Sequence, residues 1–129
     1  MLLHLRRRVE ERLAHTRRAL LSTCGPANIQ TDDFECEARG FQLYMRVPLS
    51  SDHLFNLEAS REVVVTAATW KARGLARVLD KADVPRGLMM SAEFAPWTAL
   101  IEIRPTRVQL SNADGCITET IDLNELNAP

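Results

Sequence analysis

The segment from Gly40 to Thr66 constrains the fold of this chain more than any other part of the sequence. Its first half places apolar residues at alternate positions, which is the period of a half-buried β-strand: Phe41, Leu43, Met45 and Val47. A serine turn and one or two helical turns follow, and a β-branched run over 63–67 is typical of a second strand. Two strands joined by so short a helix predict a β-rich fold with few helices.

Apolar spacing also predicts the other elements of the chain. A helix is expected over 2–18, where apolar residues recur at spacings of three and four. Further strands are expected over 19–24, 29–38, 70–79, 98–104, 106–110 and 117–123, with a connection containing a short helix over 80–96. Gly74 inside its strand predicts a bulge or a close backbone approach, and Pro105 is expected to end its strand. Six to eight strands with few helices are typical of a small closed antiparallel barrel, because closure removes exposed strand edges.

Length and composition fit one compact domain of ordinary type. The 129 residues are read as a single domain, with a helix in 1–18, a barrel in 19–123 and a tail in 124–129. A net charge of −1 gives no electrostatic case for nucleic acid or membrane partners. No apolar run approaches the ~20 residues that cross a bilayer. The three cysteines are widely spaced, so we expect free thiols and a cytoplasmic protein.

Charge is unevenly distributed between the two ends of the chain. Residues 1–18 hold six arginines against two glutamates, whereas the chain after Ser111 holds four carboxylates and no basic residue. Runs of this kind usually form solvated faces. The other interpretation is that the two ends meet, within one subunit or across a dimer.

The serine turn is the first place where residues suggest chemistry. Ser50 or Ser51 is expected to cap the short helix, and a helix start of this kind also attracts anions. His53 is interpreted either as a capping or surface histidine or as a ligand contact. Arg46 is read as a solvated strand residue or as a phosphate clamp, and Asn56 is expected to fix the turn from helix to strand.

Other candidate groups carry less specific signals. Trp70 and Trp97 are expected to pack in the core or an interface, or to wall a flat aromatic ligand. The three histidines have no partners at metal-ligand spacing, so no metal site is expected. The carboxylates of 32–37 are read as a solvated or cation-binding face.

Five pieces of the sequence together resemble the pyridoxamine 5'-phosphate oxidase-like family of FMN-binding split β-barrels, and they occur in the family's order. They are Leu20-Leu-Ser-Thr-Cys-Gly-Pro, Gly40-Phe-Gln-Leu-Tyr, Ser51-Asp-His-Leu-Phe-Asn-Leu, Arg73-Gly-Leu-Ala-Arg-Val and Ala99-Leu-Ile-Glu-Ile-Arg-Pro-Thr-Arg-Val. The resemblance implies a mainly β fold, a six- to eight-stranded antiparallel split barrel with an N-terminal helix, assembled as a homodimer. It covers the chain from about residue 19 to about residue 123.

The resemblance also implies a ligand and a reaction class. FMN is the expected cofactor, with cofactor-binding residues at Arg46, Ser50, Ser51, His53, Trp70 and Lys71. The function implied is that of a flavin-dependent oxidoreductase acting on a small molecule, and the sequence indicates no catalytic residue.

One departure from the family keeps a second hypothesis open. Relatives that hold FMN carry basic residues on the second strand and in the serine turn, where this chain has four acidic residues in 32–37 and the pair Asp52 and His53. The alternative is therefore a cofactor-free or haem-binding barrel with a binding or stress-associated role, and whether the chain is an enzyme stays open.

Overall fold

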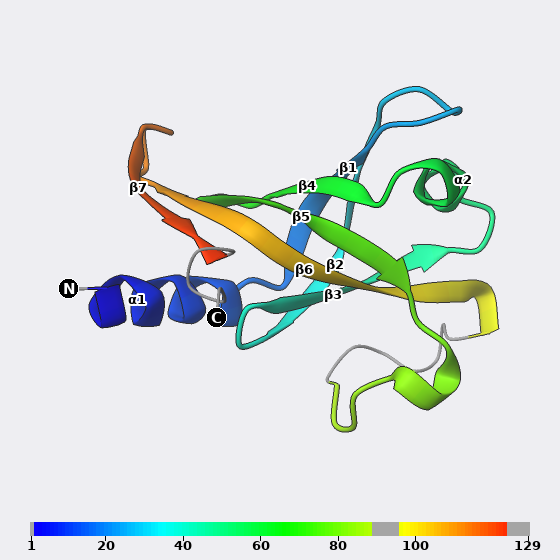
Figure 1. Ribbon diagram of the computed structural model, residues 1–129, viewed down its shortest axis with the longest axis horizontal. Coiled ribbons are helices and arrows are strands. Elements are labelled where there is room, and N and C mark those ends of the chain that lie inside the picture. Colours follow the sequence, from blue (N-terminus) through cyan, green and yellow to red (C-terminus); the bar gives the residue numbers. More distant parts are fainter. Residues whose placement is uncertain (1, 89–95, 124–129) are drawn as a thin grey trace.

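The computed structural model describes residues 2–88 and 96–123, and its elements follow one another as labelled in Figure 1. The helices are α1 (Leu2–Ala14), α2 (Asp52–Ala59) and a single 3₁₀ turn, η1 (Lys81–Asp83). The strands are β1 (Arg18–Thr23), β2 (Gln30–Arg39), β3 (Gln42–Pro48), β4 (Glu62–Thr66), β5 (Trp70–Val78), β6 (Thr98–Ser111) and β7 (Ile117–Asp122). The first helix ends four residues earlier than expected, because the chain turns at 15–17 and starts β1 at Arg18.

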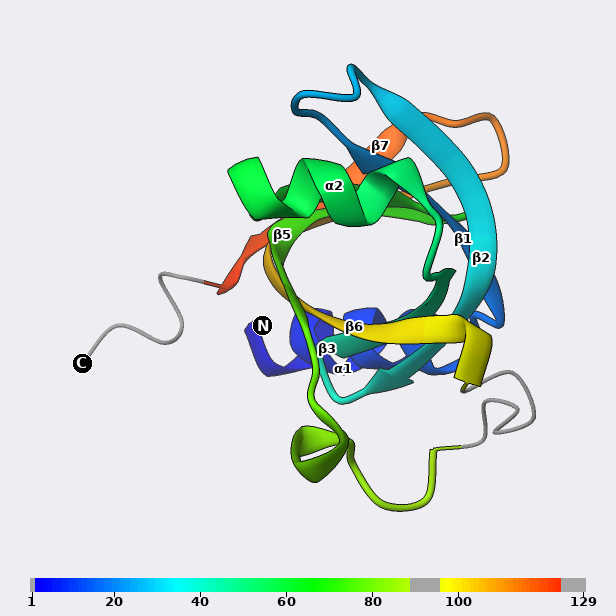
Figure 2. The ribbon, with the colours of Figure 1, turned by 90° about the vertical axis from the view of Figure 1, so that its right-hand side faces the viewer.

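The strands form one antiparallel sheet that closes on itself. Their order is β3-β2-β1-β4-β5-β6-β7, and β3 also pairs with β6, which joins the first strand of the order to the sixth. Figure 2 shows the resulting ring, with α2 across its near end. The expected fold, a mainly β protein built on a closed antiparallel barrel with an N-terminal helix, is confirmed.

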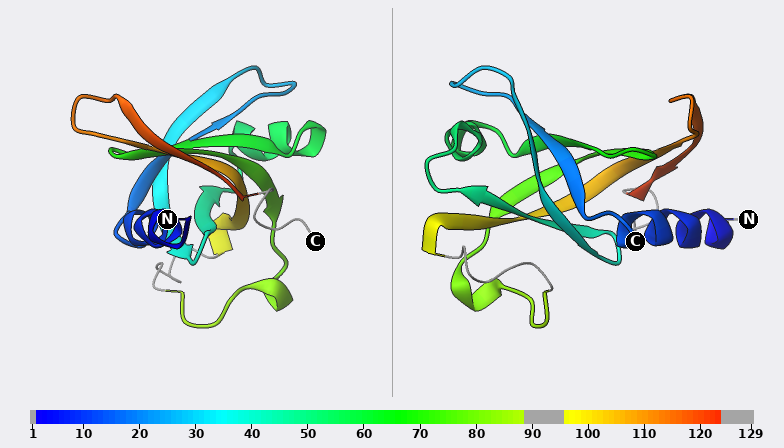
Figure 3. Two further views of the ribbon diagram at one scale, coloured as in Figure 1. Left: turned by 60° about the vertical axis from the view of Figure 1, so that its left-hand side comes forward. Right: turned by 180° about the vertical axis from the view of Figure 1, so that it is seen from behind.

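Side chains from every strand fill the inside of the barrel. Leu21, Leu43, Val65, Ile101 and Val108 belong to one buried cluster with residues of both barrel ends. The two α-helices lie at opposite ends of the barrel (Figures 1 and 3), and α1 contributes Val9 and Leu13, which are fully buried. Burying each such side chain stabilises a fold by about 1.5–3 kcal/mol, so α1 is part of the core.

The two ends of the chain meet within one subunit. The Arg8 guanidinium on α1 forms an ion pair with Glu119 on β7. The Arg12 guanidinium donates to the backbone carbonyl oxygens of Thr69 and Ser111, at 3.0 Å each. The interpretation that the basic and acidic ends of the chain meet is therefore confirmed, and they meet within one subunit.

β6 differs from the expectation that Pro105 ends a strand, because it runs unbroken from Thr98 to Ser111. The pairing of β5 with β6 shifts register beside Pro105: Arg73 lies opposite Arg107, while Gly74 lies opposite Pro105. Thr106 is thus an extra residue, and its hydroxyl donates to the Arg73 carbonyl oxygen at 3.2 Å. Proline has no backbone N–H to donate to a neighbouring strand, so a strand can accommodate proline at a bulge.

The register shift confirms the bulge predicted at Gly74. A Cβ built on Gly74 would lie 2.7 Å from the Arg104 carbonyl oxygen and 3.0 Å from the Pro105 Cα. Both are backbone atoms, so neither can turn aside as a side chain would. Glycine is required here by the close approach of the two strands.

Some expectations fall on residues outside those described. The short helix expected in 80–96 is seen as η1, but Met89, Met90 and the rest of 89–95 lie outside the described residues, as does the tail 124–129. Within 2–88 and 96–123, no helix is long and apolar enough to span a bilayer.

We predict that Gly74→Ala destabilises the protein by about 1–3 kcal/mol, because the methyl group would overlap the β6 backbone. The measurement is urea unfolding followed by tryptophan fluorescence. Lys71→Ala, an exposed change on the same strand, is the control and should stay within about 0.5 kcal/mol of the wild type. A Gly74→Ala variant as stable as this control would show that the strands do not approach so closely in solution.

Candidate functional site

The serine turn caps α2 as the sequence indicates. Ser51 is the N-cap residue, and its hydroxyl oxygen accepts a hydrogen bond from the His53 backbone N–H at 3.1 Å. Its backbone is extended, with φ −72° and ψ 138°, as capping residues require. Ser50 lies exposed beside it. The capping part of the prediction is confirmed.

His53 is a buried residue with both ring nitrogens engaged, and it is not a surface histidine. Its side chain is 1% exposed, Nε2 lies 2.7 Å from the Asp32 carboxylate, and Nδ1 lies 2.8 Å from the Thr23 hydroxyl. A carboxylate only accepts hydrogen bonds, so Nε2 donates to it, while Nδ1 shares a hydrogen bond with the Thr23 hydroxyl. Neither nitrogen is left for a ligand in this arrangement.

Asn56 extends the same buried network to the loop between β1 and β2. Its amide nitrogen donates to the Thr23 hydroxyl at 3.1 Å and to the Asn28 carbonyl at 2.9 Å. Its amide oxygen accepts from the Ala27 backbone N–H at 2.9 Å. The expectation that Asn56 fixes the turn from helix to strand is corrected: its side chain fixes a loop that lies 28 residues earlier.

The space in front of the serine turn is acidic. A hollow of about 430 Å³ is lined by Ser50, Ser51 and three carboxylates, those of Asp32, Asp33 and Asp52, and no Lys or Arg lines it. Asp33 is paired with Arg18 of β1, at 3.1 Å. A phosphate monoester carries nearly two negative charges at neutral pH, so the residues described here do not fit it. Phosphate binding by Ser50, Ser51 and His53 stays a prediction, and these contacts weigh against it.

The other predicted site residues are not brought together within one subunit. Arg46 pairs with Leu100 on β6 and Lys71 pairs with Gln109, nine positions further along that strand, or roughly 30 Å at ~3.3 Å per residue. Arg46 therefore lies near α2, and Lys71 lies near α1. The Arg46 Nη1 donates to the Thr98 hydroxyl at 3.3 Å, while its buried Nε has no hydrogen-bond partner among residues 2–88 and 96–123.

Trp70 and Lys71 lie on opposite faces of β5. The Trp70 side chain is 1% exposed inside the barrel, and its indole N–H donates to the Thr16 hydroxyl at 2.8 Å. This is the core packing that the sequence allowed for, with the ring enclosed by its own chain. Lys71 faces outward and is exposed.

The outer face of β3 is covered rather than solvated. Tyr44 packs with Leu79 and Leu100, and its hydroxyl donates to the Glu102 carboxylate at 2.9 Å. Burial, followed by the hydrogen bond to Glu102, raises the pKa of Tyr44 to about 12. Arg77 holds the same carboxylate at 3.0 Å, so these groups form a structural cluster.

A groove that the sequence did not reveal lies on the outer face of β1 and β4. It encloses about 370 Å³, and the lining side chains that reach the surface include Ser22, Ile29 and Val64. Its lining is Ser22, Thr23, Cys24, Ile29, Glu62, Val63, Val64 and Arg73. The alternation of each strand marks its outward residues, but only the pairing of β1 with β4 and of β4 with β5 sets them side by side.

A smaller hollow of about 110 Å³ adjoins this groove on β5 and β6. Its charged lining residues are Lys71, Arg73 and Arg107, which we call the cationic patch. Val64 and Arg73 line both hollows, so the groove and the cationic patch form one continuous surface.

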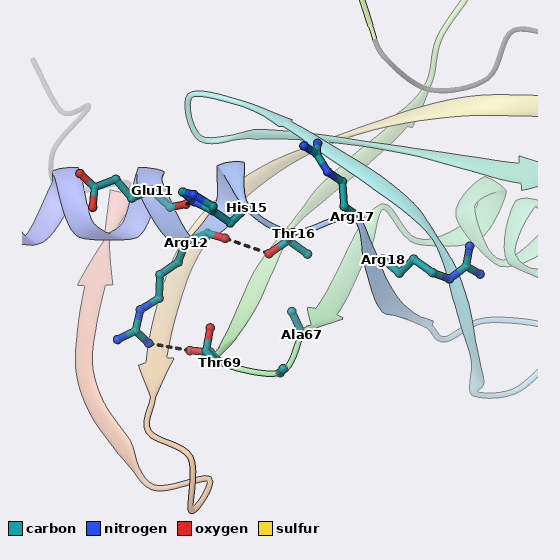
Figure 4. Close-up of a pocket in the computed structure, with 9 residues that line it drawn as sticks. Glu11, Arg12, His15, Thr16, Arg17, Arg18, Ala67 and Thr69 are labelled. Carbon is teal, nitrogen blue, oxygen red and sulfur yellow. Dashed lines mark hydrogen bonds between the residues drawn. The ribbon is translucent and has the colours of Figure 1, made fainter.

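A fourth hollow, of about 480 Å³, lies between the end of α1 and the turn from β4 to β5. Arg12, Arg17 and Arg18 line it, but Figure 4 shows their guanidinium groups pointing in different directions. Arg12 is already bonded to Thr69. These arginines do not converge on a common point, so the hollow is a poor anion site.

Comparisons with known proteins identify the fold. No family model and no curated protein matches the chain. A protein related to general stress protein 26 of B. subtilis, of the pyridoxinephosphate oxidase family, from Clostridium acetobutylicum matches with a TM-score of 0.73 at 10% identity, over 95% of this chain and 97% of that one. An F420 reductase matches with a TM-score of 0.56 at 19% identity, over 77% and 94%.

A heme binding protein from Mycobacterium smegmatis matches with a TM-score of 0.68 at 14% identity, over 88% of this chain and 56% of that one. At such identities the likeness establishes the fold. The chain has the split-barrel fold of the pyridoxamine 5'-phosphate oxidase-like proteins, as its sequence suggested.

We predict that Asn56→Ala lowers the free energy of unfolding by about 2–4 kcal/mol, because it removes a fully buried amide that bonds the buried Thr23 hydroxyl, the half-buried Ala27 N–H and the Asn28 carbonyl. Chemical unfolding monitored by circular dichroism measures this. Phe55→Ala, at a half-exposed position of the same helix, is the matched control with a change below about 1 kcal/mol. Equal effects of the two substitutions would mean that the network does not hold the β1–β2 loop.

Proposed function

We propose that this chain binds a flavin, with FMN as the first candidate, and carries out flavin-dependent oxidation or reduction of a small molecule. The observation that supports this most is the closed six-stranded barrel, a fold shared with an F420 reductase and with a protein of the pyridoxinephosphate oxidase family. The inference from fold to function is one of analogy, so the ligand site has to support it separately.

The groove on β1 and β4 offers such support. Its volume of about 370 Å³ lies within the range of small-molecule sites, about 300–1,000 Å³. Ile29 and Val64 provide apolar surface for a flat ring, and the Ser22 hydroxyl lies at its edge. A bound flavin would supply the redox chemistry, while these residues would bind and orient it and exclude water.

The proposal includes a homodimer formed over this face of the barrel. Leu20, beside the groove, is 41% exposed, and Ile29 is 74% exposed. A second copy would cover both side chains and enclose a ligand in the groove. Stable interfaces of this kind bury about 800 Å² on each partner.

The alternative is a cofactor-free or haem-binding barrel with a binding or stress-associated role, and the acidic serine turn favours it. A haem would need an iron ligand other than His53, because both nitrogens of that ring are engaged. The free thiols of Cys24, Cys36 and Cys116 fit the reducing cytoplasm, which we propose as the location under either hypothesis.

We predict that the purified protein binds FMN saturably. When the protein is titrated into FMN, the flavin fluorescence should be quenched until one chain is present per flavin, because protein atoms in the groove would stack on the ring. Protein unfolded in urea is the control and should give no saturation. A linear response of the folded protein, or a haem absorption band in its place, would reject the flavin proposal.

We predict a molecular mass of twice 14.5 kDa in solution, measured by light scattering during gel filtration. Leu20→Glu should yield a monomer, because it places a charge in the centre of the proposed interface. Leu3→Glu, at an exposed apolar position on α1, should remain a dimer. A dimer that survives Leu20→Glu, with circular dichroism unchanged, would place the interface on another face.

A further inference from the structure

We propose that the cationic patch formed by Lys71, Arg73 and Arg107 is the seat of an anionic ligand group, a phosphate monoester attached to the flat ring that the groove holds. The proposal rests on the proposed function for the identity of the ring, but not for the existence of the anion site. It places the phosphate on β5 and β6, at the opposite end of β6 from the predicted serine turn.

The strand register gathers three cations at one place. Arg73 on β5 lies directly opposite Arg107 on β6, and Lys71 lies two residues along β5 on the same outward face. Like charges directly opposite one another destabilise a sheet. An anion between them would remove this repulsion. Anion binding therefore gains a stabilisation here that an isolated surface cation would not give.

These cations are largely unneutralised by the protein. Among the described residues, neither the Lys71 ammonium nor the Arg73 guanidinium makes a hydrogen bond or an ion pair. Arg107 lies 3.8 Å from the Asp122 carboxylate, which is outside the lining of the hollow. The lining holds no carboxylate, and Gln109 adds an amide group.

The size of the hollow fits a phosphate-sized group. Its 110 Å³ equals the share of liquid volume of about four water molecules, at ~30 Å³ each. Two arginines supply forked pairs of N–H donors that match phosphate oxygens, and lysine adds a point charge.

The groove and the patch are aligned for one elongated ligand. Ser22, Val64, Arg73 and Arg107 are register partners in succession across β1, β4, β5 and β6. Three interstrand spacings of ~4.8 Å make this row about 14 Å long. A ring over Val64 would leave a short phosphorylated side chain directed at Arg73.

The serine turn carries the opposite charge to the cationic patch. Three carboxylates line it and His53 is enclosed, whereas the cationic patch presents three cations to solvent. Coulomb attraction therefore favours the patch for an anion.

The test compares FMN with riboflavin, which has the same ring and no phosphate. The wild type should bind FMN about 10–100-fold tighter than riboflavin, as expected for charged hydrogen bonds worth about 1.5–3 kcal/mol. Lys71→Ala/Arg107→Ala, which changes no residue of the groove lining, should abolish this preference and leave riboflavin affinity unchanged. Arg7→Ala/Arg17→Ala, which also removes two exposed cations, is the charge-matched control and should keep it. A preference that survives the double variant, or is lost in Ser51→Ala, would overturn the proposal.

A second measurement separates this proposal from the flavin proposal. Inorganic phosphate is titrated into the ¹⁵N-labelled wild type, and amide shifts are followed by NMR. Saturable shifts at 71–73 and 107–109, absent in the double variant, would establish the anion site even if neither flavin binds, in which case only the flavin proposal fails. Shifts confined to 50–53, or none that saturate, would reject the cationic patch.

Discussion

The pairing of β3 with β6 is the constraint on which the rest of this structure depends. It joins the two ends of the strand order, so that no strand of the six-stranded ring is left with an open edge. β6 has to be long enough to pair with β3 along its first half and with β7 along its second, while β5 follows it on the other side. The bulge at Gly74 and Thr106 lets one strand serve both halves, because an extra residue bends the strand and increases its twist.

Closure also decides where a ligand can bind. The interior is filled by apolar side chains, α1 closes one end with Val9 and Leu13, and α2 lies across the other with His53 and Asn56 bonded to β1, β2 and their loop. A site must therefore lie on the outside of the barrel. The groove on β1 and β4 and the cationic patch both lie there, whereas the buried polar network at α2 stabilises the fold.

Local patterns predicted much of this architecture, and long-range partners account for the rest. Alternating apolar residues located the strands, and Ser51 and Gly74 were read correctly as cap and bulge, because each of these depends on neighbours in the sequence. Pro105 was wrongly predicted to end its strand. A strand accepts a proline at a bulge, and this bulge depends on Gly74, which lies on another strand. For the same reason the burial of Tyr44 and the partners of Asn56 could not be predicted: the residues that cover or bind them lie 28 or more positions away. The groove was missed because no periodicity tells which outward residues become neighbours.

The anchoring of α1 has a consequence for synthesis on the ribosome. The helix emerges before all seven strands, yet its arginines bind Thr69, Ser111 and Glu119, which are made 57, 99 and 111 residues after their partners. Barrel closure likewise waits for β6. The nascent chain must therefore hold an arginine-rich helix and the open edges of β3 and β5 until β6 has been made. A pause before residue 98 leaves β3 and β5 without the strand that closes the barrel, so the rate of translation and the presence of chaperones determine how long these edges stay exposed.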